Sequence, residues 1–173
     1  MDIDPTLIRS VLQTTPQRWL HLVESLPQAL LARSPADGQW SALACLQHLI
    51  DVEHVFQSRL QAFMDGQESF PAFDPDAEGS PQQVAATAID LVSEFVALRS
   101  TSLNAIDRIQ PAGLKLECQH QELGMVYLEQ MLNEWPAHDL NHTIQAERAL
   151  MQPFIQGCGP WQPYFSDHIV RSA

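Results

Sequence analysis

The 173-residue chain is long enough for one domain with a sizeable hydrophobic core, and its composition does not shift along its length. We therefore expect a single domain over residues 1–173. The 9 basic and 21 acidic residues give a formal net charge of −12, which would repel nucleic-acid phosphates and anionic lipids. This charge argues against nucleic acid or a membrane surface as a partner.

We expect no segment for export or membrane insertion in this sequence. No run approaches 18 apolar residues, so we expect no ordinary membrane-spanning helix. Residues 1–5 are acidic and lack the apolar segment of a secretory signal. The three cysteines, Cys45, Cys118 and Cys158, are scattered and form no C-x-x-C pair, as is usual in a reducing compartment. We therefore expect a cytoplasmic protein.

Two helical patterns occupy the first part of the chain. The first spans about residues 4–31, and Thr15-Pro16 has the form of an N-cap followed by proline at the first helical position. We therefore expect this region to be interrupted there. After a turn over residues 33–39, Ser41 is the expected N-cap of a second helix, which reaches about residue 65.

Two further helical patterns follow a long connection. Residues 66–80 have the composition of a loop, and a loop of this length often connects elements that are not adjacent. Ser80-Pro81 is the expected start of a third helix that reaches about residue 109, and the fourth spans about residues 125–150. The tail after residue 151 is expected to be irregular and to pack over the bundle. Strand-type alternation is nearly absent, so the pattern predicts an all-α four-helix bundle with a crossover between its second and third helices.

Three histidines form the strongest candidate for a chemical site. His138 and His142 are four residues apart and therefore project from one side of the fourth helix. His48, at the edge of the apolar face of the second helix, is the best-placed third residue. Three protein ligands with open positions are typical of catalytic metal sites, whereas structural zinc is usually closed by four. The alternative is that these are half-buried histidines satisfied by hydrogen bonds, with no metal.

The surroundings of the histidine pair suggest how it could be oriented. Asp139 projects toward the core side, where its carboxylate could accept a ring N–H from a ligand histidine. Pro136 removes a backbone hydrogen bond, so it would either kink the fourth helix before His138 or mark the start of a helix at Trp135-Pro136.

Two more polar residues lie near the expected site. Glu53 falls within the apolar arc of the second helix, where an isolated charge would be costly. We favour a buried ion pair between Glu53 and Arg59 or Arg99. The alternatives are that the Glu53 carboxylate orients a metal ligand or that its side chain reaches water. Gln145, one turn beyond His142, could line a pocket or be a solvated surface amide.

Other chemistries lack their motifs. The chain has no glycine-rich phosphate loop, no G-x-S-x-G nucleophile motif and no H-E-x-x-H zinc motif. It also lacks the Glu-x-x-His repeats of di-iron bundles, which favours a single metal ion.

Several short motifs follow one another in a fixed order: Trp40-Ser41, Gln47-His48-Leu49, Asp51-Val52-Glu53, Phe73-Asp74, Trp135, His138-Asp139, His142 and Gln145. This set, over about residues 15–150, resembles the DinB-like superfamily. The resemblance implies a bundle of up-down-down-up topology, often a homodimer, with a three-histidine metal site on His48, His138 and His142. Zinc or nickel is then favoured as the metal, with iron or manganese as alternatives.

The resemblance leaves the reaction open. Some members are transferases or isomerases that use low-molecular-weight thiols such as bacillithiol or mycothiol, others are regarded as hydrolases, and many have no known activity. A metal on three histidines would lower the pKa of a water or thiol, for hydrolysis of a small molecule or thiol transfer to it. The alternative is a non-catalytic, dimeric, stress-related module that binds a metal or ligand. No residue is assigned as general acid or base, and no substrate carries over, because Pro136 and the tail depart from the family pattern.

Overall fold

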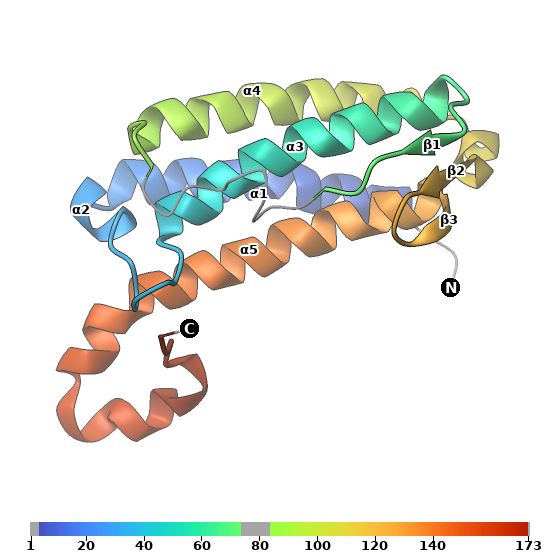
Figure 1. Cartoon of the computed structure of the whole chain (residues 1–173). Helices are drawn as coiled ribbons and strands as arrows, with labels where there is room; N and C mark the ends of the chain where they lie inside the picture. Colours follow the sequence, from blue (N-terminus) through green and yellow to red (C-terminus); the bar gives the residue numbers. More distant parts are fainter. Residues whose placement is uncertain (1–3, 74–83, 173) are drawn as a thin grey trace.

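Four long helices lie side by side in the computed structural model, which describes residues 4–73 and 84–172 (Figure 1). They are α1 (Pro5–Ser25), α3 (Ala42–Met64), α4 (Ala88–Ile106) and α5 (Leu128–Gly157). Helices α1 and α5 run in one direction and α3 and α4 in the other (Figure 1). Each helix packs on two neighbours, since both α1 and α3 contact α4 and α5. The expected all-α four-helix bundle of up-down-down-up topology is confirmed.

Helix α1 does not break at Thr15-Pro16, so this prediction was wrong. Proline has no N–H to donate to the carbonyl four residues earlier, which here is that of Leu12. That carbonyl instead accepts a hydrogen bond from Arg99 Nη1 at 2.9 Å. A tertiary contact therefore compensates for the proline, and the chain breaks only at Pro27, before the one-turn helix α2 (Gln28–Leu31).

The caps of α3 and α4 explain where these helices begin. Ser41 Oγ accepts a hydrogen bond from the Ala44 N–H at 3.1 Å, so Ser41 is the N-cap as predicted. Helix α4 begins at Ala88 because Thr87 Oγ1 accepts from the Asp90 N–H at 3.3 Å. Residues 84–87 are not helical, so the predicted third helix was too long at this end. The expected cap at Ser80-Pro81 lies outside the described residues, as does Asp74.

A small sheet lies at the end of the bundle where α3 ends and α5 begins (Figure 1). Strand β1 (Ser69–Phe70) pairs in parallel with β2 (Glu117–His120), which pairs antiparallel with β3 (Gly124–Tyr127). The short 3-10 helix η1 (Pro111–Lys115) precedes β2. Strands of two to four residues are too short to show alternation, so none of the three was predicted, and residues 125–127 of β3 were expected to be helical. The sheet places His120 beside the end of the bundle.

Helix α5 begins and ends later than predicted. Residues 125–127 belong to β3, and the helix continues through Pro136 and Pro153 to Gly157. The alternative of a helix start at Trp135-Pro136 was therefore wrong. The 3-10 segment η2 (Gly159–His168) follows, and the tail forms a hook beyond the end of the bundle (Figure 1). Gln152 ties the hook to α5, since its side chain donates to the His168 carbonyl and accepts from the Val170 N–H.

The core consists of two apolar clusters along the bundle axis. One contains Trp19, Leu46 and Phe95, and the other contains Phe56 and Trp135. Along α4 and α5, buried polar residues separate the two clusters and bring polar chemistry to the middle of the bundle. None of the helices in the described ranges is long and apolar enough to cross a bilayer.

Candidate metal centre

The three predicted histidines come together between α3 and α5. His48 lies on α3, and His138 and His142 lie one turn apart on α5. The Nε2 atoms of His48 and His138 are 3.3 Å apart, and one ring nitrogen from each of the three histidines lies within 4.8 Å of the others. His48 is 3% exposed and the other two are half-buried. We call these three residues the histidine cluster.

The spacing of the ring nitrogens suits a single metal ion. Metal–imidazole bonds of about 2.0–2.1 Å place two ligand nitrogens roughly 3–3.5 Å apart in tetrahedral or octahedral geometry. The distance between His48 and His138 falls in this range, and one ring nitrogen from each of the three histidines lies within 4.8 Å of the others. The donor set therefore fits a borderline-soft divalent ion such as zinc or nickel.

The local environment keeps the cluster in its neutral form. Burial, followed by the charge of His142, lowers the pKa of His48 to about 4. Burial and the same neighbour lower the pKa of His138 to about 3, and burial also lowers the pKa of His142. At neutral pH the three rings therefore have lone pairs to donate.

Gln145 fixes the tautomer of His142. The Nδ1 atom of His142 lies 2.8 Å from Oε1 of Gln145, and an amide oxygen can only accept a hydrogen bond. Nδ1 must therefore carry the hydrogen, which leaves the lone pair on Nε2. This is the orienting contact expected of a metal-bound histidine, and it places Gln145, predicted to support a ligand or line the pocket, directly on His142.

Asp139 does not make the predicted contact with a histidine. Its carboxylate accepts instead from Arg99 Nη1 at 2.6 Å and from Nη2 at 3.0 Å. Successive helical residues point about 100° apart, so Asp139 faces α1 and α4 while His138 faces α3. Within the described part of the chain, His138 Nδ1 is buried and has no hydrogen-bond partner.

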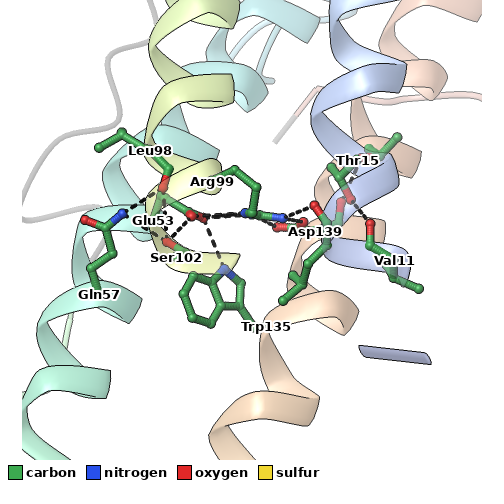
Figure 2. Close-up of polar contacts among 11 residues, drawn as sticks. Val11, Thr15, Glu53, Gln57, Leu98, Arg99, Ser102, Trp135 and Asp139 are labelled. Atoms are coloured by element: carbon green, nitrogen blue, oxygen red, sulfur yellow. Dashed lines mark hydrogen bonds and ion pairs between the residues drawn. The ribbon is translucent and has the colours of Figure 1, made fainter. Parts of the chain in front are cut away.

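Glu53 forms the predicted buried ion pair, and its partner is Arg99. Its Oε2 lies 2.7 Å from Arg99 Nη2 and also accepts from Trp135 Nε1 at 3.1 Å, while Ser102 donates to Oε1 at 2.6 Å. Figure 2 shows that these residues and Asp139 form one continuous set of contacts, which we call the Arg99 network. Burial raises the pKa of the Asp139 carboxyl despite the neighbouring guanidinium. The network holds α5 in the rotation that directs His138 and His142 toward α3.

The histidine cluster lines a pocket of about 330 Å³, which we call the central pocket. This volume suits a small molecule. Its other lining residues include the aromatic side chains of Trp40, Phe56 and Phe73 and the polar side chains of Arg59, His120 and Glu134. His120 was not predicted as a site residue, because no second histidine lies at ligand spacing from it and the sheet that brings it here was not predicted.

The fold and the site together describe a class of protein: a four-helix bundle that carries a three-histidine cluster between two of its helices. The family model of the DinB superfamily matches residues 12–146, so the chain belongs to the DinB superfamily. The structure of YfiT from Bacillus subtilis superimposes with a TM-score of 0.74 over 88% of this chain and 90% of that chain, at 18% identity. YfiT is described as a probable metal-dependent hydrolase with an unusual four-helix bundle topology. None of the curated proteins that were compared matches the chain.

Proposed function

We propose that this chain is a metal-dependent enzyme that acts on a small molecule. His48, His138 and His142 would hold one divalent metal ion, with zinc or nickel favoured over iron or manganese. The observation that carries this proposal is the convergence of three neutral imidazoles within 4.8 Å at a pocket of small-molecule size. The description of YfiT as a probable metal-dependent hydrolase supports hydrolysis as the first reaction to test.

The bound ion would lower the pKa of water or of a thiol and so supply a nucleophile at neutral pH. The chain's own residues would organise the site around it. Gln145 holds the His142 ring in the tautomer with its lone pair on Nε2, and Trp40 and Phe56 cover neighbouring parts of the pocket. The low-molecular-weight thiol and the homodimer expected from the family remain predictions, and thiol transfer is the second reaction to test.

The test combines metal content with turnover. Untagged protein, purified without chelator or added metal, should contain about one equivalent of a divalent transition metal per chain. His142→Ala should lose this metal and any turnover of hydrolase or thiol-transfer substrates, because it removes one of three ligands. The matched control is His21→Ala, which replaces an exposed histidine on α1 and should change neither quantity.

Two outcomes would count against the proposal. Wild-type protein that binds no metal after reconstitution would make the histidine cluster an ordinary set of bundle residues. Metal that binds stoichiometrically but supports no turnover would favour the non-catalytic module instead.

A further inference from the structure

His120 is enclosed by hydrogen-bond donors on both sides of its ring. Its Nδ1 lies 3.1 Å from the backbone N of Glu122 and 3.2 Å from that of Leu123. Its Nε2 lies 3.2 Å from Nη2 of Arg59. A neutral imidazole has one acceptor nitrogen and one donor nitrogen, so it cannot accept on both sides. One ring N–H must therefore point at another N–H group.

The two backbone donors decide which side carries the hydrogen. A lone pair on Nδ1 satisfies the N–H groups of both Glu122 and Leu123, so the hydrogen of the neutral ring lies on Nε2. Burial and the charge of Arg59 lower the pKa of His120, which keeps the ring neutral at neutral pH. The Nε2–H of His120 and the Nη2–H of Arg59 then point toward each other. Both groups are donors, so each needs an acceptor that the other does not provide.

Arg59 has no carboxylate at ion-pair distance among the described residues. The buried Arg99, by contrast, pairs with both Glu53 and Asp139. Its Nε is buried without a hydrogen-bond partner in the same part of the chain. Burial lowers the pKa of Arg59, and the charge of Glu134 opposes that change. Buried donors without acceptors are rare in native proteins, and an acceptor supplied by a ligand would complete the hydrogen bonds of this arrangement.

A phenylalanine ring holds these two donors in place. The Arg59 guanidinium lies 5.3 Å from the centre of the Phe70 ring, and the His120 ring meets the same ring edge to face at 5.4 Å. Phe70 is 6% exposed and belongs to β1, which pairs with β2. The donors are therefore positioned before any ligand arrives, which reduces the entropy lost on binding.

Arg59 and His120 line the central pocket, as the histidine cluster does. Arg59 follows His48 by eleven residues on α3, which is about 16 Å along the helix axis and about 20° around it. The arginine side chain leans back toward the N-terminus of the helix, which shortens that separation. One small molecule could therefore reach both ends of the pocket.

We propose that Arg59 and His120 bind a carboxylate of the substrate, whose reacting group lies at the histidine cluster. The carboxylate oxygens would accept hydrogen bonds from Arg59 Nη2 and His120 Nε2. A singly charged group is favoured over a phosphate dianion because Glu122 and Glu134 also line the pocket. The placement of the reacting end rests on the proposed function, whereas the carboxylate subsite does not.

The probe for this subsite is 4-fluorobenzoate, compared with the neutral 4-fluorobenzamide by fluorine NMR titration. We expect wild-type protein to bind the benzoate more tightly than the amide. Arg59→Gln and His120→Leu should each weaken benzoate binding about 10- to 100-fold, because each removes a hydrogen bond to a charged group. The matched control, Arg18→Gln, removes a surface arginine on α1 and should leave binding unchanged.

The variant His48→Ala separates this proposal from the proposed metal site. Arg59-dependent binding of the benzoate should persist in His48→Ala even if that protein contains no metal. Equal binding of benzoate and benzamide to the wild type, or benzoate binding unchanged in folded Arg59→Gln, would overturn the proposal. Loss of Arg59-dependent binding in folded His48→Ala, or tighter binding of inorganic phosphate than of benzoate, would also overturn the carboxylate assignment.

Discussion

At the scale of single residues, the hydrogen bond between Gln145 and His142 sets which ring nitrogen faces the cluster. We expect Gln145→Leu to lower metal affinity about 10- to 100-fold, the usual effect of losing a contact that orients a ligand. Gln145→Glu keeps an acceptor at the same place and should retain the affinity. Competition against a chromophoric chelator measures both variants, and equal affinity of Gln145→Leu and wild type would show that the contact has no role.

Only some of the individual site residues could be predicted from the sequence. The four-residue spacing of His138 and His142 follows from helix geometry alone, so it was readable directly. The acceptor role of Gln145 depends on a side-chain rotamer, which no spacing reveals. His120 meets Arg59 from 61 positions away, through a sheet whose strands are too short to be recognised in the sequence.

At the scale of elements, the Arg99 network joins all four long helices (Figure 2). Arg99 itself lies on α4 and contacts Leu12 on α1, Glu53 on α3 and Asp139 on α5. The guanidinium and both carboxylates are almost completely buried. Removing one member of such a set leaves charges in the core without compensation, which is far more costly than losing a pair at the surface.

We therefore expect Arg99→Ala to lower the free energy of unfolding by about 3–5 kcal/mol, because two buried carboxylates lose their partner. The matched control is Arg9→Ala, which removes an exposed pair with Asp107 and should leave the unfolding midpoint nearly unchanged. Urea unfolding followed by helical circular dichroism measures both. Similar midpoints for the two variants would mean that the network does not stabilise the bundle.

Two of the errors in the predicted elements share one physical cause, because tertiary contacts overrode local signals. Pro16 has the sequence context of a helix start, but Arg99 binds the carbonyl that this proline leaves free. Residues 125–127 continue the apolar pattern of α5, but they pair with β2 instead. The long helices themselves were predictable, because their apolar faces repeat over several turns.

At the scale of the whole molecule, the topology determines which helices can share a site. Parallel α3 and α4 require the long connection over residues 65–87, and this arrangement places α3 beside α5 and not beside α1. The sequence indicated the crossover through the length of that connection. The pairing of α3 with α5 was inferred from the histidines at the edges of their apolar faces and then from the family resemblance, because the amphipathic pattern of a helix does not specify its neighbours.

Anomalous X-ray diffraction tests most directly whether one metal ion lies between α3 and α5. Crystals of protein purified without chelator would be measured above and below the absorption edge of the metal found by elemental analysis. We predict one strong peak per chain, about 2.0–2.1 Å from a ring nitrogen of each of His48, His138 and His142. The absence of a peak at these histidines in metal-supplemented crystals, or a peak held by other residues, would contradict the account.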